Sequence, residues 1–402
     1  MTSTEAMVEP KPIYTARETC RVCAAKALES VLNMGNQYLV AFPDIADLSL
    51  PRAPLELVRC ADCGVLQLGH SVNPDLLYRE FHYRSGINQT MRDALTDLVL
   101  DAMGRHEGGT WLDIGANDGY LLSQVPNSFT KVACEPAFNF AEDLKQHADV
   151  VVSDYFGPHP DLDGPFNVIT SAACFYDVSD PDAFVAQIAK CLAPNGVWIN
   201  QLNDSPGMLR ANAWDAICHE HVMFYDVPTL KAMYARHGLV ITNVSHNDVN
   251  GGSVRITARH KNAATDGIEL FGLLTPSREE CMAFARRAAR WRHRFIDTMI
   301  ALRYRGPLWG YGASTKFTVL TQYLDQSHLI EAIAERNPLK YGKVMAGSWI
   351  GIKSEDEMRA AKPTALIVGP WAFRDEIVRR ESSTLEAGTA LLLPLPTIEL
   401  VC

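Results

Sequence analysis

Apolar runs separated by amphipathic segments predict an α/β fold for most of this chain. Between about residues 109 and 200, apolar runs at 150–152, 168–170 and 197–199 have the spacing of successive strands in a mostly parallel sheet. Residues 192–196 predict a tight turn before the last of these strands. A second unit begins near residue 308, and strand-like runs follow at the two segments 365–368 and 390–393.

Two helices are predicted by apolar positions that recur at helical spacing. The first presents one apolar face made of Met91, Leu95, Leu98, Val99 and Ala102. The second is a long helix near 276–304. It carries five arginines that we interpret as a solvated face rather than a binding patch: Arg286, Arg287, Arg290, Arg292 and Arg294.

A glycine turn in the first α/β unit predicts a ligand site. An apolar run ends in Asp113 and enters a turn that contains Gly115 and Gly119, and the next apolar run ends in Glu135. In such a Rossmann-like unit, backbone N–H groups approach the ligand and the second-strand carboxylate holds ribose hydroxyls. The third glycine of the dinucleotide pattern is missing and an acidic residue precedes the turn, which favours S-adenosylmethionine over a nicotinamide. A purely structural glycine turn is the alternative.

Two CxxC pairs near the N-terminus predict a metal site. Cys20 with Cys23 and Cys60 with Cys63 can supply four thiolates in a tetrahedron, the arrangement of a closed structural Zn²⁺ site. Two independent redox pairs are the alternative. The first sixteen residues contain no apolar core, so we expect no signal peptide and a reducing cytoplasmic location.

Chain length indicates more than one domain, and net charge limits the classes of partner. A chain of 402 residues is too long for one compact core, so two or three domains are expected. A net charge of −10 argues against nucleic acid as the main partner, and no apolar run approaches the ~18 residues that span a bilayer. We expect a zinc-binding domain over 1–70, a methyltransferase domain over 71–262 and a smaller Rossmann-like domain over 263–402. A monomer is the default.

Two polar segments carry the remaining candidate chemistry. The loop 81–92 is rich in hydrogen-bonding groups, although a capping loop would have the same composition. His219-Glu220-His221 lacks the spacing of a helix-borne zinc motif, and neighbours on an extended segment point to opposite faces, so at most two share one site. An imidazole suits proton abstraction at neutral pH and a carboxylate can orient it, but ordinary loop residues are an equal alternative.

Taken together, these segments resemble one family, the C-methyltransferases that act on nucleotide-linked 4-keto-6-deoxysugars. The resemblance covers nearly the whole chain in order. It rests on the four cysteines, the loop 83–92, the turn 113–119, the segment 219–221, and the motifs at 310–316, 335–340 and 369–377.

The resemblance implies roles for individual residues. His221 would remove the proton next to the ketone, and Glu220 would orient His221 or shape the polar site. His219 and Tyr83 would be candidates for donating to the enolate oxygen. Around S-adenosylmethionine it places Asp113, Gly115, Asn117, Gly119, Glu135, Pro136, Asp154, Tyr155, Ser171, Ser85 and Asn88. Toward the nucleotide-sugar substrate it places Cys218, Ser314, Lys316 and Asn337.

Departures from the family pattern keep alternatives open. Cys218 stands where the family commonly has Tyr, Phe317 replaces a usual glycine, and residues 345–352 lack the family's proline-containing loop. The substrate could therefore carry GDP rather than dTDP. Methylation at C5 instead of C3, a nicotinamide-dependent oxidoreductase and a zinc-tethered adaptor without catalysis are the competing functions.

Overall fold

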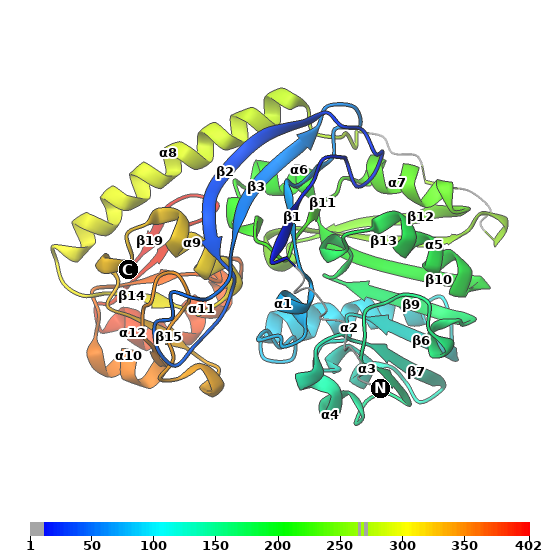
Figure 1. The fold of residues 1–402 in the computed structure, drawn as a ribbon. Coiled ribbons are helices and arrows are strands. Elements are labelled where there is room, and N and C mark those ends of the chain that lie inside the picture. Colours follow the sequence, from blue (N-terminus) through cyan, green and yellow to red (C-terminus); the bar gives the residue numbers. More distant parts are fainter. Residues whose placement is uncertain (1–11, 264–266, 269–271) are drawn as a thin grey trace, which may run out of the picture.

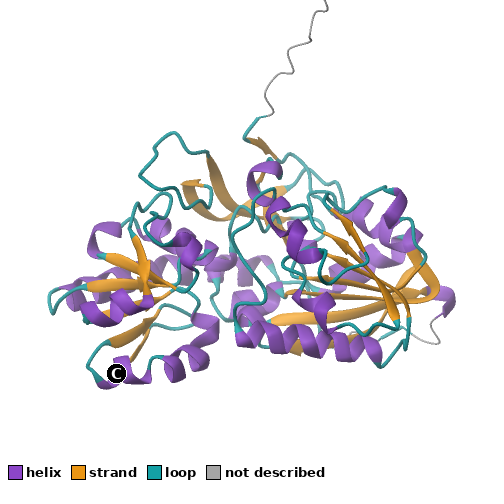
Figure 2. Cartoon of the chain, turned by 90° about the horizontal axis from the view of Figure 1, so that it is seen from below, coloured by secondary structure: helices purple, strands orange, loops and turns teal. Residues whose placement is uncertain are grey.

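Two α/β bodies are joined by a small antiparallel sheet and a long helix (Figure 1). The computed structural model describes residues 12–263, 267–268 and 272–402. Figure 2 shows the two bodies side by side, each with its strands between helices. Residues 1–11, on which most of the signal-peptide expectation falls, lie outside the described residues. Within the described ranges no helix is long and apolar enough to cross a membrane.

The N-terminal four-stranded sheet takes one strand from far along the chain. Its order is β11-β4-β3-β2 with every pair antiparallel, while β1 and β5 pair separately. The strands are β1 (Tyr14–Ala16), β2 (Leu28–Tyr38), β3 (Arg52–Cys60), β4 (Leu66–Leu68), β5 (His70–Val72) and β11 (Met223–Phe224). Because β11 begins two residues after His221, this sheet helps to fix the His-Glu-His segment.

The central sheet has seven strands in the order β12-β13-β10-β9-β6-β7-β8. The five strands from β10 to β8 are parallel, and β13 is antiparallel to both of its neighbours. The strands are β6 (Gly109–Ile114), β7 (Phe129–Cys134), β8 (Val150–Val152), β9 (Phe166–Ala172), β10 (Leu192–Asn203), β12 (Leu239–Asn247) and β13 (Ser253–His260). The strand order reverses between β6 and β9, where α/β sheets bind ligands at the carboxyl ends of their strands.

The helices of this first half cover the central sheet or lead into it. They are α1 (Asp75–Tyr78), α2 (Gln89–Met103), α3 (Tyr120–Gln124), α4 (Ala141–Leu144), α5 (Pro181–Cys191), α6 (Ser205–Arg210) and α7 (Val227–Arg236). All five apolar positions predicted for α2 are buried, which confirms that helix. Residues 192–196 correct a prediction: they belong to β10, whose pairing with β9 shifts register between Leu192 and Val197.

The C-terminal sheet repeats the Rossmann-like pattern on a smaller scale, with the order β16-β15-β14-β17-β18-β19. Only the last strand is antiparallel, and the order reverses between β14 and β17. The strands are β14 (Leu308–Tyr311), β15 (Ala332–Glu335), β16 (Ile352–Ser354), β17 (Ala365–Val368), β18 (Ala390–Leu393) and β19 (Glu399–Val401). The helices are α9 (Thr315–Leu324), α10 (Glu355–Ala361), α11 (Arg374–Arg380) and α12 (Ser382–Glu386).

The long helix α8 (Arg278–Arg303) packs against both β2 and β14 and so connects the parts of the molecule. A capping box between Ser277 and Glu280 begins it. The prediction of one solvated arginine face holds in part, because Arg286, Arg290 and Arg294 are exposed. Arg287 instead donates to the Leu209 carbonyl and Arg292 to the Tyr323 carbonyl, each at 2.6 Å, so these two arginines tie α8 to its neighbours.

Candidate active site

The four N-terminal cysteines come together as a metal-ligand set. Their Sγ atoms all lie within 4.8 Å of one another. The Sγ atoms of Cys20 and Cys63 are 3.7 Å apart, and those of Cys23 and Cys60 are 3.6 Å apart. Each cysteine of one CxxC pair therefore lies next to a cysteine of the other pair. Four thiol groups in this arrangement fit a tetrahedral structural Zn²⁺ site with no coordination position left for catalysis.

The glycine turn after β6 is held by Glu135, which follows β7. The carboxylate accepts the Asn117 N–H at 2.8 Å and the Ala137 N–H at 2.9 Å. Gly115 has φ +72°, and a Cβ there would lie 2.9 Å from the Cβ of Cys174, so this position requires glycine. Two hydrogen bonds leave the carboxylate with free acceptor positions. The turn and the carboxylate therefore fit the ribose end of S-adenosylmethionine.

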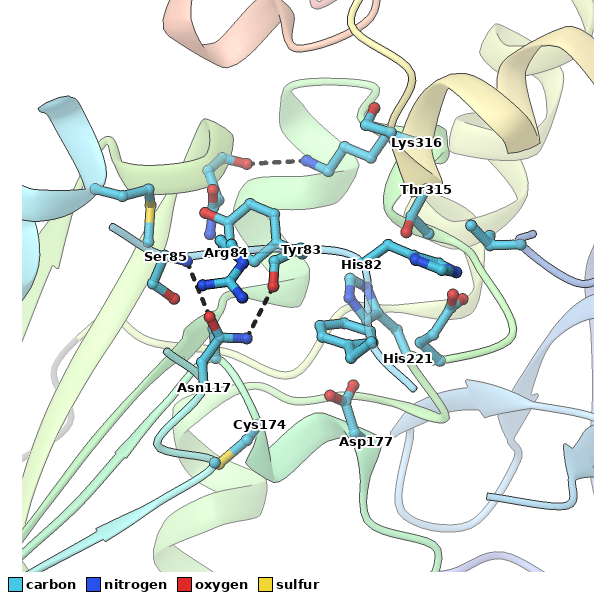
Figure 3. Close-up of a pocket in the computed structure, with 18 of the residues that line it drawn as sticks. His82, Tyr83, Arg84, Ser85, Asn117, Cys174, Asp177, His221, Thr315 and Lys316 are labelled. Atoms are coloured by element: carbon cyan, nitrogen blue, oxygen red, sulfur yellow. Dashed lines mark hydrogen bonds between the residues drawn. The ribbon is translucent and has the colours of Figure 1, made fainter. Parts of the chain in front are cut away.

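The loop before α2 closes over this turn (Figure 3). The Asn117 side chain accepts the Ser85 N–H at 2.9 Å and donates to the Tyr83 carbonyl at 3.0 Å. The Gly86 N–H donates to Asp118 at 2.9 Å. Backbone contacts thus fix the loop, and the Arg84 side chain adds an ion pair with Asp143 at 2.8 Å.

A cavity of about 940 Å³ lies between the two α/β bodies. This volume is at the upper end of ordinary ligand pockets, which suits two ligands bound side by side. The sequence-predicted residues that line it are Tyr83, Ser85, Asn88, Gly115, Asn117, Glu135, Pro136, Tyr155, Glu220, His221, Ser314, Lys316 and Asn337. The fold therefore brings most of the candidate residues from both bodies to one space.

Three predicted cofactor residues do not line the cavity. Asp113 is buried behind the turn, where it accepts a 2.6 Å hydrogen bond from Thr170, and burial raises its pKa to about 7. Ser171 is fully buried between Trp198 and Asn200. The Gly119 backbone is left-handed and faces His147. These residues shape the turn and the sheet and lie outside the cavity lining, so the structure does not support their predicted contact with the cofactor.

Three more predicted residues do not line the cavity: Asp154, predicted for the cofactor, and Cys218 and His219, predicted for the substrate. Asp154 points to the surface, where it forms an ion pair with Arg79 at 3.0 Å. Cys218 is 1% exposed and packs in the hydrophobic core. The buried His219 ring bonds through Nε2 to the Ala53 carbonyl at 3.0 Å, so it pins the segment to β3 and cannot reach a substrate in the cavity.

His221 faces the cavity with one nitrogen free. Its Nδ1 lies 2.8 Å from the Ala216 carbonyl oxygen, which can only accept, so Nδ1 carries the proton and Nε2 keeps its lone pair. The Tyr176 ring meets the imidazole edge-on at 4.4 Å. Burial, and to a smaller extent the Lys316 charge, lowers the His221 pKa to about 4. A backbone carbonyl thus orients His221, and the role of Glu220 stays a prediction.

The C-terminal body supplies polar groups to the opposite side of the cavity. Ser314 caps α9 by accepting the Phe317 N–H, and Asn337 accepts the Leu339 N–H. The Lys316 ammonium donates to the Asn250 carbonyl at 3.2 Å and forms no ion pair with a carboxylate of the described residues. Lys316 therefore offers an unneutralised cation to a ligand in the cavity.

Several lining residues were missed by sequence reasoning. Tyr78 and the pair Tyr176–Asp177 lie beside His221, whereas Trp371 and Arg380 come from the C-terminal body. Asp177 follows β9 at the sheet edge that binds ligands, so its position in the strand order was a usable signal. Trp371 lies inside the recognised motif 369–377, but nothing in its spacing showed that it faces the other body.

Three family models match consecutive parts of the chain, and one curated relative aligns with nearly all of it. Residues 20–78 match a putative zinc binding domain, 83–244 a methyltransferase domain and 248–396 a C-methyltransferase C-terminal domain. C-methyltransferase NovU of Streptomyces niveus is 26% identical over 403 residues, covering 94% of this chain and 96% of that protein.

Two solved structures align with less than half of the chain. One is an S-adenosylmethionine-dependent methyltransferase of Clostridium acetobutylicum, with 10% identity and a TM-score of 0.36 over 42% of this chain and 92% of that one. The other is 1,6-didemethyltoxoflavin-N1-methyltransferase of Burkholderia thailandensis, with 15% identity and a TM-score of 0.33 over 42% of this chain and 77% of that one.

The three family matches occur in the same order as the zinc site, the glycine-turn body and the C-terminal body of the structure. The matches identify a zinc-binding domain, a methyltransferase domain and a C-methyltransferase C-terminal domain in this chain, and they support an S-adenosylmethionine-dependent C-methyltransferase.

Proposed function

We propose that the enzyme methylates C3 of a nucleotide-linked 4-keto-6-deoxysugar, with His221 as the base. The observation that carries this proposal is the free Nε2 of His221 in a cavity shared by both bodies. The sugar class follows from the family resemblance of the sequence motifs. A carbon nucleophile requires removal of a C–H proton, and only a carbon next to the ketone is acidic enough for an imidazole.

His221 and Tyr83 have different roles in the proposed reaction. Nε2 of His221 accepts the C3 proton, while the C–H electron pair moves into the enolate. Because the pKa of His221 is about 4, the ring is neutral at pH 7 and available as a base. S-adenosylmethionine, when bound, supplies an electrophilic methyl group that the enolate carbon takes, and the electrons of the broken S–CH₃ bond stay on sulfur. Tyr83 remains a candidate donor to the enolate oxygen, since it lines the cavity.

We infer two binding regions in this cavity, one in each α/β body. Gly115, Asn117 and Glu135 would hold S-adenosylmethionine in the central body. In the C-terminal body, Ser314, Lys316 and Asn337 would face the nucleotide diphosphate, because Lys316 brings a positive charge without a carboxylate partner.

A panel assay tests the proposal. The enzyme is incubated with S-adenosylmethionine and dTDP- or GDP-linked 4-keto-6-deoxysugars, and products are analysed by mass spectrometry and by NMR. We expect a mass gain of one CH₂ with the new methyl group on C3. A methyl group on oxygen, or no product from any member of the panel, would overturn the proposal, whereas a methyl group on C5 would move the site of attack to the other side of the ketone.

A further inference from the structure

The short turn Trp214–Ala216 carries the carbonyl that orients His221. The Ala216 oxygen lies 2.8 Å from Nδ1 of His221 and accepts its proton in a hydrogen bond. An imidazole can rotate about its side-chain bonds when its N–H has no fixed acceptor. Whatever holds the turn 214–216 in place therefore also determines where Nε2 of His221 points.

The first two residues of this turn contact the C-terminal half of the chain. The Trp214 ring packs against Trp291 of α8 and Tyr323 of α9, with ring centroids 4.6 and 5.0 Å apart. Asp215 is only 1% exposed, and its Oδ2 accepts the Nε1–H of Trp371 at 2.6 Å. The turn that carries the Ala216 carbonyl is thus bonded to the C-terminal body.

Trp371 is itself held in one orientation by the surrounding groups. The Gly251 backbone lies directly against the ring, since a Cβ at this position would be 2.7 Å from Cη2 of Trp371. On the C-terminal side, the Lys316 ammonium lies 5.6 Å from the centre of the indole, within the range of a cation–π contact. These contacts keep the indole N–H directed at Asp215.

Asp215 depends on the donor that Trp371 provides. Burial raises the pKa of its carboxyl group, and the Lys316 charge, the Trp371 bond and the N–H groups of Asp215 and Ala216 oppose this rise. Oδ1 is buried without a hydrogen-bond partner among the described residues. Loss of the indole N–H would leave Oδ2 unsatisfied as well, so the turn would have to move for the carboxyl group to reach water. Because Ala216 is the next residue, its carbonyl would move too.

We propose that Trp371 is a positioning residue for the reaction, which acts through Asp215 and the Ala216 carbonyl to hold His221 in the orientation that removes the substrate proton. The inference rests on the proposed function for the identity of the base. It goes beyond that function because it gives the C-terminal body a role in the chemical step as well as in binding.

The test uses a 4-ketosugar of the panel that wild type methylates. Trp371→Phe removes the indole N–H and keeps an aromatic ring. It should lower kcat and the rate of C3–H exchange in D₂O about 10- to 100-fold, as expected for a misaligned base. KM for the sugar and the affinity for S-adenosylhomocysteine should stay nearly unchanged. A raised KM with an unchanged kcat would mean that Trp371 binds the sugar directly, and the inference would be wrong.

Trp111→Phe is the matched control for stability. It removes a buried bond of the same kind, from Nε1 of Trp111 to the Thr170 hydroxyl at 3.0 Å, on a strand of the central sheet. Both variants should lower Tm, but Trp111→Phe should keep kcat close to the wild-type value. Equal losses of kcat in the two variants would reduce the role of Trp371 to general stability and contradict the inference.

Substitutions of Asp215 test the link from its other end. Asp215→Asn keeps an oxygen that can accept the Trp371 N–H and should retain most of kcat, whereas Asp215→Leu should match Trp371→Phe. The double variant Trp371→Phe/Asp215→Leu should be no slower than the slower single variant, because both changes break one link. Losses that multiply in the double variant would show two independent effects and overturn the inference.

Nitrogen NMR of the histidine side chains gives a readout that needs no sugar. His221 signals are assigned by their absence from His221→Asn. Wild type should show the tautomer with the proton on Nδ1, and Trp371→Phe should show a mixture of both tautomers. An unchanged tautomer together with wild-type C3–H exchange in Trp371→Phe would overturn the inference alone. Absence of exchange and methylation in wild type would instead contradict the proposed function, while the tautomer comparison would still test the link from Trp371 to His221.

Discussion

Glu135 and Glu335 hold the two glycine turns of the molecule in the same way. Glu135 accepts the Asn117 N–H at 2.8 Å, and Glu335 accepts the Ala313 N–H at 2.7 Å. Each carboxylate also accepts the N–H of the second residue after it, at 2.9 and 2.8 Å. Glu135 directly follows β7, Glu335 ends β15, and both line the same cavity, so the two bodies present equivalent turns to one space.

This equivalence provides a matched pair of variants. Glu135→Gln should weaken S-adenosylmethionine binding about 10- to 100-fold, because a neutral amide accepts ribose hydroxyls less strongly than a carboxylate does. Glu335→Gln should leave that affinity unchanged, since its turn lies in the other body. Isothermal titration calorimetry measures both. An equal loss in the two variants would mean that the turns do not bind separate ligands.

Loss of zinc should lower catalytic activity as well as stability. β11 follows the His-Glu-His segment and pairs with β4. Cys60 ends β3, and Cys63 lies in the turn between β3 and β4. Cys60→Ser should therefore abolish zinc retention, lower Tm by at least about 5 °C and reduce turnover. Elemental analysis, thermal melts and activity are compared with Cys402→Ser, an exposed cysteine outside the cluster. Full activity in zinc-free protein would contradict the coupling.

His219 should matter for stability and not for chemistry. Loss of its buried bond to Ala53 in His219→Gln should cost about 1–3 kcal/mol, with kcat unchanged in the folded fraction. Burial lowers its pKa to about 4, below the unfolded value of about 6.5, so its contribution to stability is lost as pH falls through that range. Denaturant melts at pH 7 and pH 5 should show a smaller pH effect in the variant. A fall in kcat at unchanged stability would restore a catalytic role.

The contrast between His219 and His221 shows which features can be predicted from local sequence patterns and which depend on tertiary contacts. Apolar spacing predicted five of the seven strands of the central sheet and three of the six strands of the C-terminal sheet. The two CxxC pairs predicted the metal cluster, because such features are local. Which of two histidines faces the cavity depends on β11 joining a sheet more than 150 residues away, and no local pattern encodes that contact. Ser171 was misplaced because it lies at the right sheet edge but points into the core.

The pH profile should reflect the buried state of His221. Its pKa of about 4 places the acidic limb of kcat/KM near pH 4, since protonation of Nε2 removes the base. Between pH 5 and 8, His221 should cause no change in rate. The profile is measured with a 4-ketosugar of the panel that has no titrating group near neutral pH. A limb near pH 6.5 would show that the imidazole is solvated in the working enzyme.

The proposal depends most on proton removal by His221, and solvent deuterium exchange tests that step directly. The 4-ketosugar is incubated in D₂O with enzyme and S-adenosylhomocysteine, so that the proton can exchange without methyl transfer, and deuterium at C3 is followed by NMR. Wild type should exchange C3–H, and His221→Asn should slow this exchange at least about 100-fold with unchanged affinity for S-adenosylhomocysteine. Exchange at the wild-type rate in His221→Asn would contradict the assignment of the base.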